Sequence, residues 1–220
     1  MKPTYTVVSF SGGKDSTAML LRMMEIGEHI DEVVNVDTGM EFPAMYEHID
    51  RIRREVESAG IKYTTLRNDK TFEYIMLHQP IESEKFGTHY GYGFPTPVIR
   101  WCTRHMKLDL LNKHFRDLKE KYDLVQCIGL ACDEFKRLER PGNNQPGHRH
   151  PLVEWGWSEA DCLEYCRTRE RERLDPAIRT VQQGVMLVLS SCTHIGTPQV
   201  VGELPGTVVQ TSGMGGLYER

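Results

Sequence analysis

The segment Tyr5–Met24 constrains the fold of this chain more than any other. It begins with an apolar, β-prone run, Tyr5–Phe10, and continues after a short polar loop with methionine and leucine residues at helical spacing. The order strand, glycine-rich loop, helix places backbone N–H groups and a helix N-terminus against an anion. Gly12 and Gly13 lack a Cβ, so the backbone can approach that anion closely. The sequence therefore predicts a phosphate cradle between the first strand and the first helix.

The loop is not a Walker P-loop. That motif requires a further glycine at the position of Val8 and a serine or threonine at the position of Asp15. Lys14 adds a positive charge, and the neighbouring hydroxyl groups add hydrogen-bond donors and helix caps. A glycine turn that merely caps a helix, with Lys14 in solvent, is the alternative interpretation.

The run Ser11-Gly12-Gly13-Lys14-Asp15-Ser16 resembles the PP-loop of the N-type ATP pyrophosphatases and of their relatives, the phosphoadenylyl-sulfate (PAPS) reductases. Later segments resemble further signatures of the PAPS reductase family, in the same order along the chain. These segments are Val36–Pro43, Trp101–Lys107, Gly129–Arg137 and Pro151–Asp161. The resemblance extends over about residues 5–166.

The resemblance implies an α/β fold, with a doubly wound, mainly parallel sheet flanked by helices, of the adenine nucleotide alpha hydrolase type. The pattern of residues 5–66 favours the same fold, because strand and helix patterns alternate at short spacing. Gly27 is a stop signal for the first helix, and the second helix is expected from about Pro43 to Ala59, with Pro43 in its first turn and Gly60 at its end. A further helix is expected from about Arg100 to Tyr122. We expect residues 1–170 to form a PP-loop nucleotide-binding domain and residues 171–220 to form a divergent or truncated C-terminal tail.

The resemblance also implies site residues. The expected nucleotide-binding residues are Ser9, Ser11, Gly12, Gly13, Lys14, Asp15, Ser16, Asp37, Thr38 and Gly39. The groups expected at the substrate or its phosphates are Arg100, Lys107, Asp133, Glu134 and Arg137. Lys14, Asp15 and Cys102 are the expected catalytic residues, and Asp15 is also a candidate ligand for Mg²⁺ bound with ATP.

Ordinary structural roles remain open for several of these residues. Glu134 and Arg137 are three residues apart and form a plain ion pair if they lie on a helix surface. A helix N-terminus and nearby cations favour a reactive thiolate at Cys102, but a cysteine beside Trp101 is also a common packing residue. Between Arg67 and Arg100, residues Phe72–His78 are a candidate short helix. The aromatic and glycine residues that follow indicate either a binding loop or lid, or a surface loop held by its rings.

The tail departs from the family. PAPS reductases carry a catalytic cysteine in a C-terminal Glu-Cys-Gly-type motif, and the sequence around Cys192 does not match it. Some relatives have a C-terminal cysteine cluster, which in this chain would join Cys102 to bind an iron–sulfur cluster. That group of cysteines is also missing here, so we expect no iron–sulfur cluster in this chain. Ser158 followed by Asp161 predicts the N-cap of a helix that runs to about Arg169. Cys162 and Cys166 share a face of this helix and are interpreted as buried thiols. The run Val181–Leu189 is a candidate strand.

Composition narrows the function classes. The net charge is −4, which gives no overall attraction to nucleic acid or to an anionic membrane. No apolar run is long enough to span a bilayer and no signal peptide is evident, so we expect a soluble cytoplasmic protein with no membrane partner. A homodimer is a candidate assembly. The expected partners are an adenine nucleotide, ATP or PAPS, and an unknown acceptor.

Three functions follow from these patterns. The first is an enzyme that adenylylates an acceptor with ATP and releases pyrophosphate. The second is a thiol-dependent reductase of PAPS or adenylyl sulfate. The third is a nucleotide-binding module without catalysis.

Overall fold

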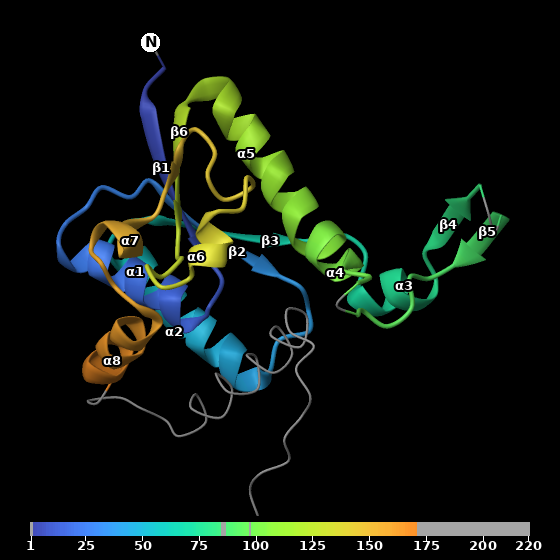
Figure 1. The fold of residues 1–220 in the computed structure, drawn as a ribbon, viewed down its shortest axis with the longest axis horizontal. Coiled ribbons are helices and arrows are strands. Elements are labelled where there is room, and N and C mark those ends of the chain that lie inside the picture. The colour runs from blue at the N-terminus through green and yellow to red at the C-terminus, as the bar shows by residue number, and fades with distance from the viewer. Residues whose placement is uncertain (1, 85–86, 97, 171–220) are drawn as a thin grey trace, which may run out of the picture.

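A central parallel sheet organises the computed structural model, which describes residues 2–84, 87–96 and 98–170. The five strands follow the order β3-β2-β1-β6-β7, and all four neighbouring pairs are parallel (Figure 1). The sheet is formed by β1 (Thr4–Phe10), β2 (Glu32–Asp37), β3 (Lys62–Arg67), β6 (Asp123–Ile128) and β7 (His148–Arg149). This is the doubly wound α/β fold that the sequence predicted, and that prediction is therefore confirmed.

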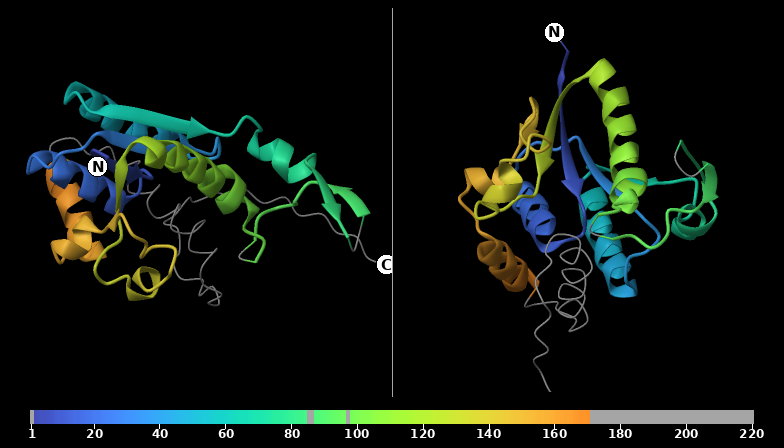
Figure 2. Two further views of the ribbon diagram at one scale, coloured as in Figure 1. Left: turned by 90° about the horizontal axis from the view of Figure 1, so that it is seen from above. Right: turned by 45° about the vertical axis from the view of Figure 1, so that its right-hand side comes forward.

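Helices cover both faces of this sheet, as the two views of Figure 2 show. Val8 and Phe10 of β1 belong to the larger core, with apolar residues of α1 (Lys14–Glu25), α2 (Pro43–Ser58) and α8 (Glu159–Glu170). Val7 faces the other way and packs in a smaller core with Phe115 of α5 (Asp109–Lys121). Successive residues of a strand point to opposite faces, so the adjacent apolar residues Val7 and Val8 of β1 are what burial on both sides requires.

The predicted starts and ends of α1 and α2 agree with the structure. Pro43 occupies the first turn of α2, where its missing N–H costs no helical hydrogen bond. Gly27 and Gly60 follow the two helices with φ of +72° and +76°, the left-handed conformation that ends a helix most cheaply with glycine. These local signals were sufficient to place both helices.

The segment between Arg67 and Arg100 is not one long loop. It contains α3 (Phe72–Leu77) and a hairpin of β4 (Pro80–Ser83) and β5 (Gly87–Tyr90), which project from the body as an arm (Figure 1). A Cβ on Gly91 would lie 2.3 Å from the carbonyl oxygen of Met76, so the chain returns from the hairpin tightly against α3. The short helix expected over Phe72–His78 is present as α3. The hairpin was not predicted, because strands of four residues leave too short a pattern to recognise.

The helix expected from about Arg100 to Tyr122 is also divided. It consists of α4 (Trp101–Thr103), a π-helical turn η1 (Arg104–Leu108) and α5, joined without a break in helical backbone angles. Asn68 donates a side-chain hydrogen bond to the carbonyl of His105 at 2.9 Å, which satisfies a backbone acceptor within the widened turn. Such turns distort the helical ladder locally and occur frequently at functional sites.

The last described elements are short. They are α6 (Phe135–Leu138), β7, α7 (Pro151–Glu154) and α8. Ser158 and Asp161 form the expected capping interaction of α8: Ser158 Oγ donates to Asp161 Oδ2 at 2.6 Å, and Asp161 N donates to Ser158 Oγ at 3.2 Å. The candidate strand Val181–Leu189, Cys192 and the remainder of the tail lie outside the described residues. Among the described helices, none has the length and apolar character needed to cross a membrane.

Candidate functional site

The loop from Ser11 to Ser16 joins the end of β1 to the start of α1 and is closed by its own hydroxyl groups. Ser16 Oγ donates to the carbonyl of Gly13 at 3.0 Å and accepts from Ser11 N at 3.2 Å. The Ser11 and Ser16 hydroxyl oxygens are 3.0 Å apart. No side chain caps α1 at Gly13, so the first-turn N–H groups of this helix lack intrahelical acceptors and remain available to an anion.

Two glycines let the loop pack against its neighbours. Gly12 has φ of +81°, and a Cβ there would lie 2.9 Å from Met45 Sδ of α2. Gly129, just after β6, lies against the backbone of Ser16: a Cβ added at Gly129 would be 2.8 Å from Ser16 Cα and 2.9 Å from Ser16 N. The start of α1 is therefore held between α2 on one side and the end of β6 on the other.

A buried histidine fixes α1 to α2. His48 is 6% exposed, and its Nε2 lies 3.1 Å from Thr17 Oγ1. Arg51 NH2 lies 2.9 Å from His48 Nδ1. A guanidinium can only donate, so Nδ1 accepts and the ring proton is on Nε2, directed to Thr17. Burial, followed by the charge of Arg51, lowers the pKa of His48 to about 4, so the ring is neutral near pH 7.

Lys14 lies between two carboxylate groups. Its Nζ is 2.8 Å from Asp15 Oδ1 and 3.2 Å from Glu159 Oε2. One carboxylate oxygen from each of Asp15, Glu134 and Glu159 lies within 4.8 Å of the others. Burial alone lowers the pKa of Lys14, but its bonds to Asp15 and Glu159 reverse this effect and raise the pKa above its usual value.

Asp15 has a raised pKa although it contacts Lys14. Burial is the largest cause, and the charges of Glu159 and Glu134 add to it, while the hydrogen bond from Lys14 acts in the opposite direction. The site therefore holds three acidic groups and one ammonium group in a partly desolvated space. A phosphate that approaches Lys14 must compete with these carboxylates for the ammonium group.

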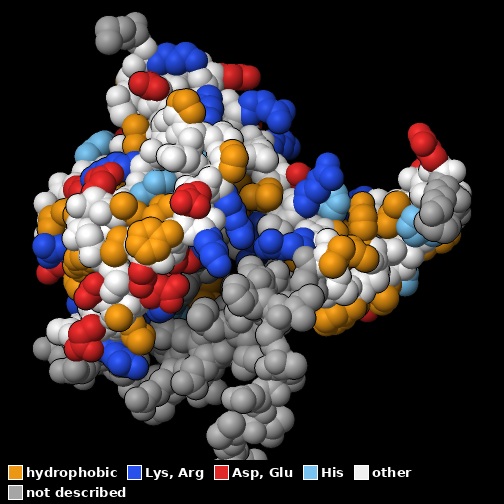
Figure 3. Space-filling model, viewed as in Figure 1, with side chains coloured by type: hydrophobic (Ala, Val, Ile, Leu, Met, Phe, Trp, Pro, Cys, Tyr) orange, Lys and Arg blue, Asp and Glu red, His pale blue; other side chains and the backbone are white. Residues whose placement is uncertain are grey.

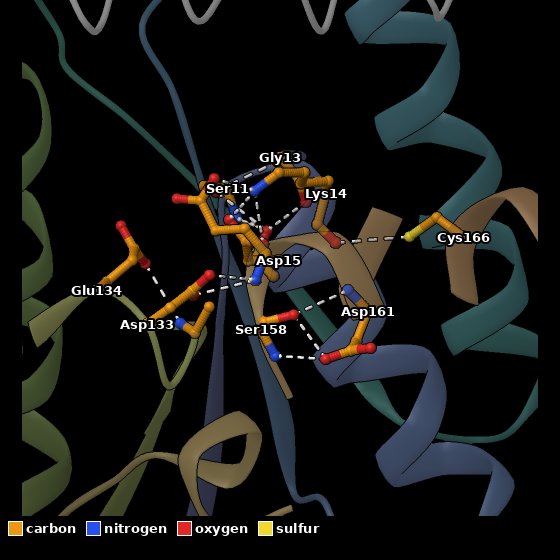
Figure 4. A network of polar contacts seen from close by, with 12 residues as sticks. Ser11, Gly13, Lys14, Asp15, Asp133, Glu134, Ser158, Asp161 and Cys166 are labelled. Atoms are coloured by element: carbon orange, nitrogen blue, oxygen red, sulfur yellow. Dashed lines mark hydrogen bonds and ion pairs between the residues drawn. The ribbon is translucent and has the colours of Figure 1, made fainter. Parts of the chain in front are cut away.

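The chain brings Glu159 to the loop from far along the sequence. Glu159 follows the Ser158 cap of α8, and its backbone N donates to both carboxylate oxygens of Asp133, at 3.1 and 3.3 Å. On the same helix, Cys166 Sγ lies 3.5 Å from the carbonyl of Lys14. Asp133 thus orients the end of α8 that supplies Glu159 (Figure 4).

The turn after β2 is held by its own hydrogen bonds. Asp37 accepts from Gly39 N at 2.8 Å and from the Tyr46 hydroxyl at 3.0 Å, and it forms an ion pair with Arg67 at 2.8 Å. Thr38 Oγ1 accepts from Met40 N at 3.4 Å. Each predicted residue of this turn lies at the C-terminal edge of the sheet, where ligands of open α/β sheets bind.

Ser9 lies within β1 rather than in the loop. Its hydroxyl accepts a hydrogen bond from Gln126 Nε2 of the neighbouring strand β6 at 3.0 Å. This contact ties the two central strands together just before both reach the edge of the sheet.

The remaining predicted groups are more dispersed. Arg100 is exposed, and Lys107 Nζ lies 3.8 Å from Glu41. Cys102 packs against the cluster of Ile75, Trp101 and Met106 at the base of the arm. No hydrogen bond or ion pair among the described residues joins Arg100, Cys102 or Lys107 to the loop at Ser11–Ser16.

Glu134 and Arg137 form the ion pair that the alternative interpretation anticipated. Glu134 Oε2 also accepts from the backbone N of Ala131 at 3.2 Å, which holds the turn that follows β6. Glu134 nevertheless points one carboxylate oxygen toward the group around Asp15. Arg137 is thus engaged with Glu134 in this structure rather than directed at the loop.

Three residues of the site could not be found from the sequence. Glu159 could not be recognised because it is the first residue of a helix that lies more than 140 positions from the loop in the sequence. His48 carried no signal apart from its place on the apolar face of α2. Gly129 belongs to a segment that was recognised, but its contact with Ser16 depends on the pairing of β6 beside β1.

Two known proteins resemble parts of this chain. A protein of Methanocaldococcus jannaschii, "Uncharacterized protein MJ0066", is 31% identical over 136 residues, which are 61% of this chain and 24% of that protein. The match thus spans about a quarter of the relative's length. A solved structure of the U34-tRNA thiolase NcsA from Methanococcus maripaludis, with its 4Fe–4S cluster, has 17% identity and a TM-score of 0.41, over 90% of this chain and 77% of that one.

The cofactor expectations are corrected by this finding. The thiolase structure carries an iron–sulfur cluster, which overturns the expectation that such a cluster has no place in this chain. That exclusion rested on the missing tail motif alone, whereas cysteine thiolates are the usual cluster ligands and the sequence contains six cysteines. The expectation of Mg²⁺ with ATP, and of Asp15 as its ligand, is not retained, and we assign no cluster to this chain.

The extent of the match to a known domain decides the family. Residues 5–170 match the phosphoadenosine phosphosulfate reductase domain. This range contains the loop at Ser11–Ser16, the turn after β2 and every described helix that packs on the sheet. The chain therefore belongs to the phosphoadenosine phosphosulfate reductase domain family, as the resemblance of its motifs implied.

Proposed function

We propose that this chain is an enzyme that binds an adenine nucleotide at the C-terminal edge of its sheet and transfers the adenylyl group of ATP to an acceptor. The observation that carries the proposal is the loop between β1 and α1. It combines free N–H groups at a helix N-terminus with a lysine and a glycine of positive φ. We also propose that residues 1–170 act as the PP-loop nucleotide-binding domain.

The phosphates would bind at the start of α1, where the N–H groups of its first turn and Lys14 favour negative charge. In the reaction, an acceptor oxygen or nitrogen attacks the α-phosphorus, and the bond from the α-phosphorus to the bridging oxygen breaks. The electron pair leaves with pyrophosphate, whose charge Lys14 stabilises. Asp15, whose pKa is raised chiefly by burial, accepts the proton of the acceptor.

The packing around the loop supports this role. Preorganised donors contribute most when they need not rearrange during the reaction. Gly12 contacts α2, Gly129 contacts Ser16, and His48 holds Thr17. These three contacts keep the first turn of α1 in place before a ligand arrives.

Binding of a fluorescent ATP analogue and release of pyrophosphate test the proposal. We expect Lys14→Ala to weaken binding at least tenfold, because it removes the ammonium group closest to the helix N-terminus. Lys119→Ala, an exposed lysine at the far end of α5, serves as the matched control and should bind as the parent does. Equal affinity and equal pyrophosphate release in the parent and Lys14→Ala would refute the proposal.

Family membership favours a second candidate, reduction of a sulfonucleotide to sulfite. That reaction requires a thiol that attacks the sulfur and a second thiol, supplied by a dithiol reductant, that resolves the product. Cys102 is the partly exposed thiol nearest the arm. Sulfite formed from PAPS by the parent and lost in Cys102→Ser would support this candidate, and sulfite retained in that variant would exclude Cys102 from the reaction.

A further inference from the structure

Two segments at the edge of the sheet carry cations that have no ion-pair partner among the described residues. The segment Phe94–Lys107 contains three Lys or Arg residues and no Asp or Glu. Arg100 and Arg104 in this segment, and Lys136 and Arg140 in and after α6, are all exposed. None of these four, which we call the cationic band, forms an ion pair with another described residue. The whole chain has a net charge of −4, so this positive charge is a local feature.

The topology places both segments at the same edge of the sheet as the loop at Ser11–Ser16. Helix α6 follows the C-terminal end of β6. The segment Phe94–Lys107 leads into α5, which runs back along the sheet to the start of β6, so this segment also lies at the C-terminal edge (Figure 1). Figure 3 shows Lys and Arg side chains gathered on this face between α6 and the base of the arm.

Exposed aromatic rings accompany the cations. Phe94 is 79% exposed and Phe135 is 68% exposed. Phe135 immediately precedes Lys136, and Phe94 belongs to the acid-free segment with Arg100. Cations that follow a phosphate backbone, combined with exposed rings on which bases stack, form the pattern of single-stranded nucleic acid binding.

We infer that the acceptor substrate is a single-stranded nucleic acid, whose phosphates bind the cationic band while Phe94 and Phe135 stack on its bases. This inference rests on the proposed function, because it names the acceptor of the same site. A duplex would present the phosphates without free base faces, and an acidic peptide would leave the two rings without a stacking partner. The single strand uses both features of the surface.

Fluorescence anisotropy with a labelled mixed-sequence 20-mer tests the inference. RNA, single-stranded DNA and duplex DNA are compared in the absence of ATP, so that strand binding is measured independently of nucleotide binding. We expect RNA or single-stranded DNA, or both, to bind at least tenfold more tightly than the duplex. Binding of the fluorescent ATP analogue is measured separately in the absence of any strand, which separates a failure of this inference from a failure of the proposed function.

The variants distinguish phosphate contacts from stacking. We expect a salt dependence with log-log slope of about −3 for four phosphate contacts, at about −0.7 per contact for a single strand. The double variant Arg100→Ala/Arg104→Ala should bind at least tenfold more weakly at low salt, with a slope closer to zero by about 1.4. Phe94→Ala and Phe135→Ala should each weaken binding about tenfold and leave the slope unchanged, because stacking is not ionic.

The matched control is Lys119→Ala/Lys121→Ala, which removes two exposed lysines at the opposite end of α5. This control should retain parental binding. Equal loss in the control and in the Arg100/Arg104 variant would overturn the inference, because it would show a diffuse charge effect. Equal binding of duplex and single strand, or displacement of the strand by polyglutamate as effectively as by unlabelled strand, would also overturn it.

Discussion

The buried contact between His48 and Thr17 gives a prediction whose size follows from the structure. The folded-state pKa of His48 is about 4, against an ordinary value of 6.5. Burial is the main cause, and the donor Arg51 at Nδ1 would repel a second ring proton. Because the unfolded chain takes up this proton first, folding is weakened as the pH falls from 6.5 toward 4.

The magnitude can be worked out for one convenient interval. Between pH 7 and pH 5, a shift of this size removes about 2 kcal/mol from the free energy of unfolding. Most carboxylates stay ionised over that range, so the histidine contributes strongly to the change. The variant His48→Gln keeps a donor for Thr17 and has no group that titrates here.

Urea unfolding at pH 7 and pH 5 measures the effect. We expect the parent to lose about 2 kcal/mol more than His48→Gln between the two values. The control His29→Gln replaces a histidine whose side chain is 80% exposed, and it should follow the parent. If the parent and His48→Gln lose the same free energy within about 0.5 kcal/mol, the assignment of a neutral, buried His48 is wrong.

Three further changes test the packing around the loop. Gly129→Ala should lower the free energy of unfolding in urea by about 1–3 kcal/mol and weaken binding of a fluorescent ATP analogue, because the added Cβ would overlap the backbone of Ser16. Gly142→Ala is the control, because an added Cβ meets open space there. Equal results for the two variants would contradict the packing at Gly129. Gly12→Ala should lower the free energy of unfolding in urea by at least about 1 kcal/mol, because alanine is strained at the left-handed φ of this position. An unchanged urea midpoint would refute this expectation. Ser158→Ala should lower the thermal midpoint by an amount equivalent to about 1 kcal/mol through loss of the α8 cap, a result that Ser158→Thr should largely avoid.

Much of the fold could be predicted because its signals are local. The apolar run of β1, the glycines that end α1 and α2, and Pro43 in the first turn of α2 each act through the backbone of a few residues. The capping pair Ser158 and Asp161 is local as well, and the structure shows it as expected. The β4–β5 hairpin could not be predicted because its strands are too short to leave a recognisable pattern. The π-helical turn η1 could not be predicted because its form depends on contacts with Asn68 and the Trp101 cluster.

The candidate site was predictable only in part for the same reason. The residues of the loop are adjacent in the sequence, so the motif Ser11–Ser16 identified them without any knowledge of the fold. Glu159 contacts Lys14 only because α8 packs against α1 and Asp133 holds its first turn. Arg137, by contrast, shares a motif with Glu134 and is engaged by it in an ion pair.

The sequence by itself determined the type of element at the loop, since a glycine-rich turn between a buried strand and a helix has few other conformations. It also determined the family, because motifs in a fixed order survive in the linear chain. Only the tertiary structure decided which charges surround Lys14 and which cations at the sheet edge have no partner among the described residues. Charge pairing depends on distances of about 3 to 4 Å between groups that are far apart in the sequence, and folding alone sets those distances.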